Sequence, residues 1–149
     1  MSGDTAHQER HFEAYIVEQL QKQGWQVGAT SGYDTERALF GEDLVAWLQE
    51  TQPKTWAKLL AANQNSEGQA GEALMNRLAQ ALDKDGTLHV LRRGFSLAGC
   101  GHIDLSEAAP EDRRNEEVLR RYAANRLRVV PQLQYHPARK LAIDLVFFI

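Results

Sequence analysis

The apolar residues in the first half of the chain recur every three or four positions, which is the period of an amphipathic helix. Phe12, Ile16 and Leu20 form such a stripe over residues 5–23. Gly24 follows, at the position where a helix often ends with a residue in the left-handed backbone conformation. The sequence then predicts a short edge strand at 25–28. Three further helices are predicted, at 39–50, from Pro53 onward and at 67–82. The first half of the chain is therefore predicted to be mainly helical.

The character of the pattern changes after residue 86, where strand-like segments appear. The predicted elements are, in order, a strand-like stretch from Leu88 toward Phe95, a Gly-rich irregular segment over 96–110, a helix over 111–125, an extended segment over 127–135, a hairpin connection over 136–139 and a final strand over 141–149. Because proline has no N–H, Pro131 predicts a sheet edge or a bulge in the first strand of this hairpin. Helices followed by an antiparallel hairpin indicate an α/β or α+β domain with a small mixed sheet.

Asp144 stands inside the apolar run of the final predicted strand, which reads Leu-Ala-Ile-Asp-Leu-Val-Phe-Phe-Ile over 141–149. Such a run is typical of a strand that is buried on both faces. An unpaired, ionised carboxylate there would cost several kcal/mol, so it must be paired, hydrogen-bonded, protonated or bound to a metal. Asp144 is therefore a candidate ligand of Mg²⁺. The alternative is a structural carboxylate that a nearby arginine or backbone donors satisfy.

Length and composition fit one globular domain without a membrane span. The chain has 149 residues, of which 43% are hydrophobic and 25% are charged. No run approaches the ~18 apolar residues of a transmembrane helix, and the polar, acidic start is unlike a signal peptide. Cys100 is the single cysteine, which fits a reducing compartment, so we expect a cytoplasmic protein.

Positive charge is concentrated in one stretch, residues 118–140. This stretch contains six basic side chains and no acidic one, although the net charge of the whole chain is −3. The six are Arg120, Arg121, Arg126, Arg128, Arg139 and Lys140. A basic segment next to an acidic site would suit the binding of DNA phosphates. The alternative is a solvated helix end and a hairpin edge, where Arg and Lys are common.

Several catalytic motifs are absent from the sequence. It contains neither a Gly-Lys-Ser/Thr phosphate loop nor a Gly-x-Ser-x-Gly nucleophile motif. Cys100 and His102 form a single Cys-x-His pair, which is a weak zinc signal without further ligands. A Glu-x-Lys pair, which would put a second carboxylate and a cation on one strand face, does not occur. Because metal-dependent phosphodiester hydrolysis usually needs both groups, a nuclease site on Asp144 would be incomplete.

Glu13 is the second candidate for a catalytic role. It lies close to the apolar stripe of the first predicted helix. From there it could reach a metal-bound water if that helix packs beside the Asp144 strand. The alternative is a partly solvated glutamate, and Glu18 of the same helix is expected to be a surface residue.

A series of segments adds a family resemblance. In chain order they are Phe12-Glu13-x-x-Ile16, Gly24-Trp25, Asp43-Leu44-x-x-Trp47-Leu48, Thr51-Gln52-Pro53, Leu88-x-x-Leu91-Arg92-x-Gly94-Phe95, Asn115-Glu116, Tyr122-x-x-Asn125-Arg126-Leu127-Arg128, Gln132-Leu133-x-Tyr135 and Ile143-Asp144-Leu145-Val146. Together they resemble the N-terminal nuclease domain of the R subunit, the motor and cleavage subunit, of type I restriction enzymes. The Thr-Gln-Pro, Asn-Arg and Ile-Asp segments are the more specific parts.

The resemblance implies a restriction-endonuclease-like fold of the PD-(D/E)xK class, with residues 1–149 as the N-terminal part of a single nuclease domain. Asp144 would then be the metal-binding aspartate and Glu13 the first-helix glutamate. In the family, Glu-x-Lys follows on the next strand, and an ATP-driven translocase follows the nuclease domain. The implied activity is Mg²⁺-dependent cleavage of double-stranded DNA, with the modification and specificity subunits as partners. The chain alone is expected to be inactive.

The competing interpretation is a non-catalytic DNA-binding or subunit-assembly module that keeps the nuclease fold. Its contact surfaces would be the basic stretch and Trp25, Trp47 and Trp56, unless these tryptophans belong to the core. Salt-dependent DNA binding that does not depend on Asp144 would favour this interpretation.

Overall fold

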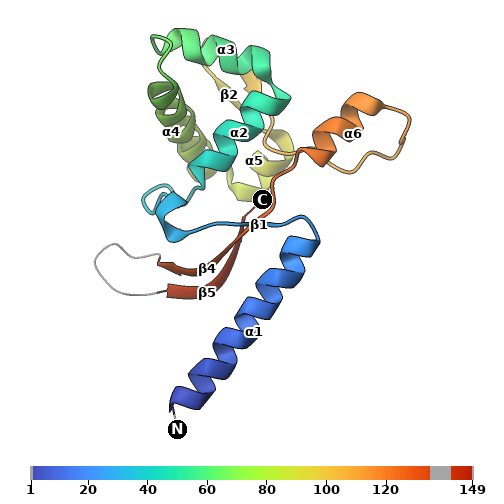
Figure 1. The fold of residues 1–149 in the computed structure, drawn as a ribbon. Helices are drawn as coiled ribbons and strands as arrows, with labels where there is room; N and C mark the ends of the chain where they lie inside the picture. The colour runs from blue at the N-terminus through green and yellow to red at the C-terminus, as the bar shows by residue number, and fades with distance from the viewer. Residues whose placement is uncertain (1, 135–141, 149) are drawn as a thin grey trace. The chain divides into compact units, whose positions relative to one another are not determined.

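The chain folds into a mixed α/β structure with two small sheets (Figure 1). The computed structural model describes residues 2–134 and 142–148. The chain divides into two compact units, a first unit made of Met1–Thr35 with Arg126–Ile149 and an inserted unit made of Glu36–Asn125. Across the described ranges, no helix is both long and apolar enough to cross a membrane.

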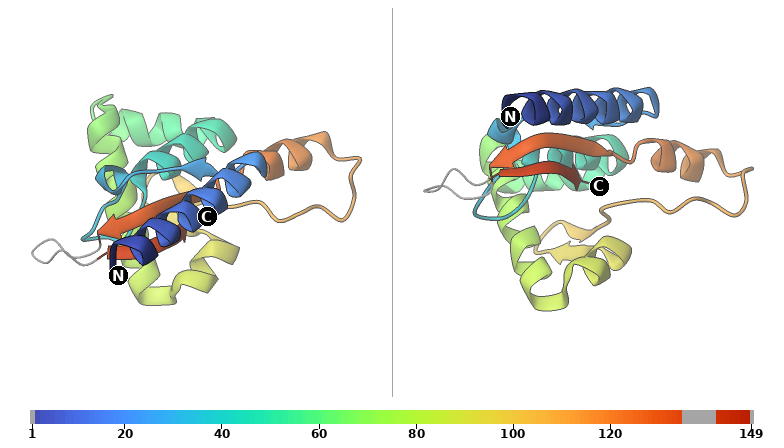
Figure 2. Two further views of the ribbon diagram at one scale, coloured as in Figure 1. Left: turned by 60° about the horizontal axis from the view of Figure 1, so that its bottom comes forward. Right: turned by 90° about the horizontal axis from the view of Figure 1, so that it is seen from below.

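The first unit combines one long helix with a three-stranded sheet. Its elements are α1 (Ser2–Lys22), β1 (Gln26–Val27), the 3-10 helix η1 (Thr30–Gly32), β4 (Arg128–Gln134) and β5 (Ala142–Phe148). The strand order is β1-β4-β5, with β1 parallel and β5 antiparallel to β4. Helix α1 packs against β1 and β4 (Figure 2). The first helix, the short edge strand and the final antiparallel pair are thus confirmed, while the predicted connection over 136–139 lies outside the described residues.

The covered face of α1 is rotated away from the predicted stripe. Half-buried positions on it include Glu13, Ile16, Val17 and Leu20. Phe12, by contrast, is 66% exposed, so the prediction that it is buried is wrong. At about 100° per residue, Phe12 lies about 90° from the centre of this half-buried face, whereas Glu13 lies close to that centre.

Strand β4 is covered on both faces at its start. Val129 and Val130, whose side chains point to opposite faces, are both fully buried. Strand β1 pairs with β4 at Arg128 and Val129, whereas Pro131 pairs with Leu145 of β5. Within the described residues no strand pairs with β4 on the other side of Pro131, because the short β1 pairs only with Arg128 and Val129. The prediction that this strand lies at a sheet edge is nevertheless wrong, because β4 is the central strand of the order β1-β4-β5.

The inserted unit contains helices and one β-hairpin. Its elements are α2 (Gly41–Thr51), α3 (Pro53–Ala62), α4 (Glu67–Asp85), α5 (Thr87–Arg93), β2 (Phe95–Leu97), β3 (Gly101–Ile103) and α6 (Glu116–Ala123). The large, fully buried side chains of this unit include Leu48, Leu74, Val90 and Ile103. Trp47 and Trp56 are also buried, which places them in the core rather than on a docking surface.

The helix starts of this unit follow the sequence closely. Pro53 occupies the first turn of α3, where its missing N–H leaves no intrahelical bond unmade. Ser66 caps α4, and its hydroxyl accepts a hydrogen bond from the N–H of Gln69 at 3.3 Å. The three helices predicted in this half of the chain are confirmed.

Two predictions for the second half are wrong, and a third is right in part, because a helix does form but starts later than predicted. The stretch from Leu88 toward Phe95 is mainly the helix α5, because seven residues are too few for apolar spacing to distinguish a helix from a strand. The segment predicted to be irregular contains the β2–β3 hairpin. The helix predicted over 111–125 begins only at Glu116, where the Asn115 side chain caps it.

Candidate active site

Asp144 lies in the middle of β5. The backbone pairs that flank it are Ile143 with Leu133 and Leu145 with Pro131. Asp144 therefore occupies an interior position of the antiparallel ladder, and the predicted strand around it is confirmed. Its carboxylate lies outside the part of the molecule that the structure describes.

The sheet face to which Asp144 belongs is covered where its side chains are described. Residues alternate between faces along a strand, so Asp144 shares a face with Val146 and with the partner of Val146, Val130. Val130 is fully buried, and Arg128, two residues away on the same face, is only 8% exposed. A low-dielectric setting of this kind raises the free-energy cost of a carboxylate without a partner.

Glu13 is placed on the same sheet from the helix side. It lies near the centre of the half-buried face of α1, and α1 packs against β1 and β4. Strand β4 in turn carries β5 as its antiparallel neighbour. The first unit thus gathers the elements of both predicted catalytic residues around one sheet, although their roles stay predictions.

Two of the predicted DNA-binding arginines lie where β1 meets β4. The guanidinium group of Arg128 donates to the Gln26 side-chain carbonyl at 2.8 Å and to the backbone carbonyl of Val27 at 3.2 Å. Arg126 donates to the same Gln26 oxygen at 3.4 Å. Because Arg128 is buried and bridges two strands, it stabilises the β1–β4 pairing, which leaves little of its surface for a phosphate.

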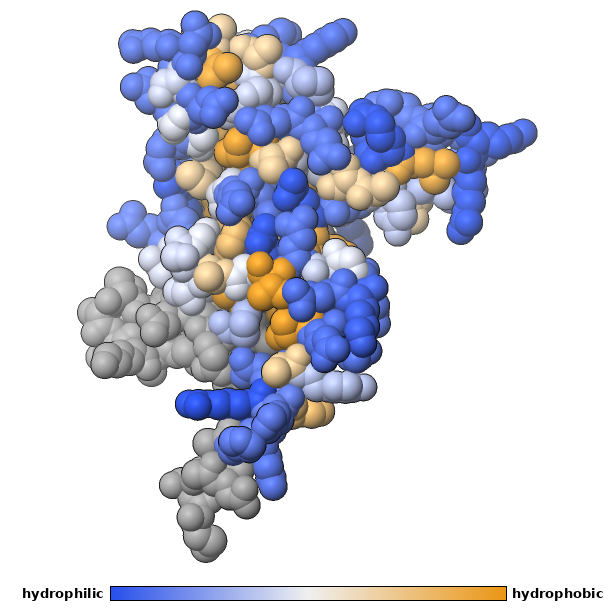
Figure 3. Space-filling view, viewed as in Figure 1, coloured by the Kyte–Doolittle hydropathy of each residue, from blue (hydrophilic) through white to orange (hydrophobic). Residues whose placement is uncertain are grey.

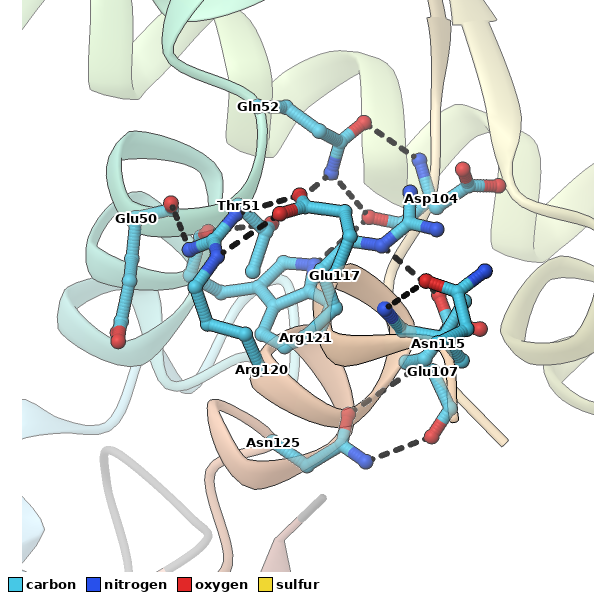
Figure 4. Close-up of polar contacts among 12 residues, drawn as sticks. Glu50, Thr51, Gln52, Asp104, Glu107, Asn115, Glu117, Arg120, Arg121 and Asn125 are labelled. Carbon is cyan, nitrogen blue, oxygen red and sulfur yellow. Dashed lines mark hydrogen bonds and ion pairs between the residues drawn. The ribbon is translucent and has the colours of Figure 1, made fainter. Parts of the chain in front are cut away.

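Arg120 and Arg121 of α6 are each paired with a carboxylate of the inserted unit. Arg120 lies 2.7 Å from Glu117 and also donates to the backbone carbonyl of Glu50 at 3.4 Å (Figure 4). Its hydrogen bond and charge hold the pKa of Glu117 below its ordinary value. Arg121 lies 3.5 Å from Glu107. The surface around α6 is predominantly hydrophilic (Figure 3).

The other two predicted DNA-binding residues, Arg139 and Lys140, lie outside the described residues. Binding of DNA by the basic stretch therefore stays a prediction. The four members that the structure describes all contact other parts of the protein. Any phosphate that they bind must compete with those contacts.

No group of three or more His, Cys, Asp or Glu side chains is arranged to hold a metal ion among the residues that the structure describes. Of the weak Cys-x-His pair, Cys100 is buried and His102 is exposed. The predicted metal ligand, Asp144, is a carboxylate, and Glu13 is predicted to reach a metal-bound water. Mg²⁺ often takes one or two carboxylates together with water molecules, so the chemistry of these residues fits Mg²⁺.

No protein family model, curated protein or solved structure matches this chain.

The structure assigns a role to Gln52 and Asn125, two side chains that the sequence did not single out for any function. The side-chain amide of Gln52 pairs with the backbone of Asp104: its oxygen accepts from the Asp104 N–H at 3.0 Å, and its nitrogen donates to the Asp104 carbonyl at 2.8 Å. The indole N–H of Trp47 donates to the same carbonyl at 2.8 Å. Gln52 thereby satisfies the backbone of the segment that follows β3 (Figure 4).

Asn125 repeats this arrangement three residues further along the segment. Its oxygen accepts from the N–H of Glu107 at 3.0 Å, and its nitrogen donates to the Glu107 carbonyl at 2.7 Å. Gln52 and Asn125 belong to the Thr-Gln-Pro and Asn-Arg segments, which were the more specific parts of the resemblance. Those segments were the available signal, and their physical role here is to hold the segment from Asp104 to Glu107.

Proposed function

We propose that this chain is the N-terminal part of an endonuclease domain that cleaves double-stranded DNA in an Mg²⁺-dependent reaction. The observation that carries the proposal is the arrangement of the first unit. Asp144 occupies an interior position of β5, and Glu13 lies at the centre of the half-buried face of the helix that packs on the same sheet. The resemblance to the R subunit of type I restriction enzymes supports the same assignment, including a restriction-endonuclease-like fold.

In this proposal Asp144 holds the metal ion and Glu13 supports it. A bound Mg²⁺ supplies a Lewis acid for the scissile phosphate and lowers the pKa of a water molecule. The basic residues from Arg120 to Lys140 are proposed to contact the DNA backbone where their contacts within the protein allow it.

The groups that complete such a site are proposed to come from outside these 149 residues, because the sequence contains no Glu-x-Lys pair. The chain by itself is then inactive, and the activity belongs to a larger protein that contains it. A Glu-x-Lys pair is expected within about 15 residues after Ile149, the span of one hairpin turn and one strand. In a type I restriction complex, the partners would be the modification and specificity subunits, and ATP would be used by a separate translocase.

The test compares four versions of that larger protein: wild type, Asp144→Asn, Glu13→Gln and Glu18→Gln. Glu18 is the matched control, because it lies on α1 and, among the described residues, pairs with Lys22 at the surface. Plasmid cleavage in the presence of Mg²⁺ and ATP is measured together with the melting temperature. We expect Asp144→Asn to abolish cleavage, Glu13→Gln to reduce it about 10- to 100-fold, and Glu18→Gln to leave it unchanged. Full cleavage by a folded Asp144→Asn variant would overturn the proposal.

The non-catalytic DNA-binding or subunit-assembly module is the alternative outcome of the same experiment. If no version of the larger protein cleaves DNA, and salt-dependent DNA binding is the same with and without Asp144→Asn, the module is the better assignment.

A further inference from the structure

Exposed basic side chains lie close together on α5. His89, Arg92 and Arg93 are all exposed, and their spacing of three and four residues places them on one side of the helix. Arg92 and Arg93 make no hydrogen bond or ion pair with the described residues, in contrast to Arg120 and Arg128. We call these three side chains the α5 cationic face.

The hairpin that follows α5 extends this positive region. Arg77 of α4 donates its Nε–H to the backbone carbonyl of Ser96 at 2.9 Å, and its two terminal nitrogens make no further hydrogen bond within the described residues. Ser96 pairs across the hairpin with His102, which is exposed. Residues 87–103 contain two arginines, two histidines and no acidic residue, although the chain as a whole has a net charge of −3.

In the sequence, acidic residues flank residues 87–103 on both sides. Asp104 follows β3, and its carboxylate lies 3.0 Å from the His102 ring. Asp83 and Asp85 end α4, with Lys84 between them. The guanidinium groups of Arg92 and Arg93 are paired with none of these carboxylates, so they are available to an anion from outside the protein.

We propose that the α5 cationic face, together with Arg77 at the hairpin that follows α5, binds the phosphate backbone of double-stranded DNA. The inference rests on the proposed function, which makes DNA the substrate, and it places a contact to that substrate away from the basic stretch singled out by the sequence. A guanidinium group matches a phosphate with two parallel hydrogen bonds, and sequence-independent binding requires only such contacts. A protein partner would need a buried apolar centre, and Leu88 is the only exposed large apolar side chain recorded on this helix.

The experiment measures the binding of a short fluorescein-labelled DNA duplex to the 149-residue chain by fluorescence anisotropy, in EDTA and over a range of salt concentrations. The test variant is Arg92→Gln with Arg93→Gln. The control is Arg10→Gln with Arg113→Gln, which removes the same charge from two exposed arginines that also make no hydrogen bond or ion pair with the described residues. Because Arg92 and Arg93 also complement the negative end of the α5 dipole, the melting temperature of each variant is measured as well.

We expect the test variant to bind about tenfold more weakly and to lower the slope of log K against log salt by about 2. The control variant is expected to bind within about twofold of wild type. Equal losses in both variants, or DNA binding that Arg92 and Arg93 do not affect, would overturn the inference. Displacement of the duplex by poly-glutamate as readily as by unlabelled DNA would also overturn it, because an acidic protein would then be the better partner.

The two proposals can fail separately. If the larger protein cleaves DNA through Asp144 while the Arg92 and Arg93 variant binds normally, only the inference about α5 is lost. If the variant weakens binding but no version cleaves DNA, the DNA contact stands and the nuclease assignment fails.

Discussion

The side chain of Gln52 pairs with the backbone of Asp104 in the way that a neighbouring strand would, with hydrogen bonds of 3.0 Å and 2.8 Å. A carboxamide has a donor and an acceptor side by side, so it can satisfy the N–H and the C=O of one residue at once. Asn125 does the same at Glu107. The segment between β3 and α6 therefore keeps a fixed path without belonging to a sheet.

Replacement of Gln52 by glutamate tests this pairing. A carboxylate can still accept from the Asp104 N–H, but its second oxygen then faces the Asp104 carbonyl and cannot donate to it. We expect Gln52→Glu to lower the free energy of unfolding by about 1–3 kcal/mol at pH 7, measured by urea denaturation. Part of the loss should be recovered as the pH falls and the introduced carboxyl group becomes protonated, because the acid can donate again.

The matched control for this variant is Gln49→Glu, which makes the same chemical change at an exposed position of α2. Its effect on the free energy of unfolding should stay within about 0.5 kcal/mol. Equal effects at the two positions would show that the added charge, rather than the lost pairing, is responsible.

Gly94 gives a second prediction, because it joins α5 to β2 with a positive φ of 71°. A Cβ atom there would collide with the backbone carbonyl of Ile103 and with the ring of His102. We expect Gly94→Ala to lower the free energy of unfolding by about 2 kcal/mol or more, since the strain and the collision add. Thermal unfolding followed by circular dichroism measures the effect.

Gly68 is the matched control for Gly94. It lies in α4 with open space where a Cβ would be, so Gly68→Ala should raise the free energy of unfolding by up to about 1 kcal/mol. If Gly94→Ala is as well tolerated as Gly68→Ala, the path of the chain from α5 into β2 differs from the one described.

Long, regular elements could be predicted from the sequence, and short or non-local features could not. The four-residue spacing of Leu74, Leu78 and Leu82 is repeated often enough to predict α4. Helix α5 is too short for its spacing to decide between helix and strand. The pairing of Gln52 with Asp104 follows no period, because it joins a side chain to a backbone 52 residues away.

The candidate site shows the same division. The apolar run around Asp144 predicted a strand, and the structure agrees. The burial of that strand on both faces stays a prediction, because its side chains lie outside the described part of the molecule. The count of basic residues, however, could not reveal their partners: Arg128 is buried against Gln26, which lies 102 positions earlier in the chain. Charge density along a sequence therefore identified basic residues without distinguishing those that hold the fold from those that face outward.

The ion pair of Glu117 with Arg120 predicts a pH effect. Arg120 lowers the pKa of Glu117 in the folded protein, so the pair stabilises the fold above the ordinary pKa of a glutamate. That contribution is lost as the pH falls through the lowered pKa. In an NMR titration, Arg120→Gln should move the pKa of Glu117 back up toward its ordinary value, and Arg113→Gln should leave it nearly unchanged. An unchanged Glu117 titration in Arg120→Gln would contradict the pairing.

Asp144→Asn separates the catalytic interpretation of Asp144 from the structural one. If Asp144 serves a metal site, its negative charge destabilises the folded protein when no metal is bound. Asp144→Asn should then raise the free energy of unfolding of the metal-free protein by about 1 kcal/mol or more. Mg²⁺ should then raise the melting temperature of the wild-type larger protein, but not that of the variant, because a ligand stabilises only the state that binds it. If an arginine or backbone donors satisfy Asp144 instead, the same substitution should destabilise the protein by about 1–3 kcal/mol, and Mg²⁺ should affect both proteins alike. Opposite signs of one measured free-energy change thus decide between a nuclease carboxylate and a structural one.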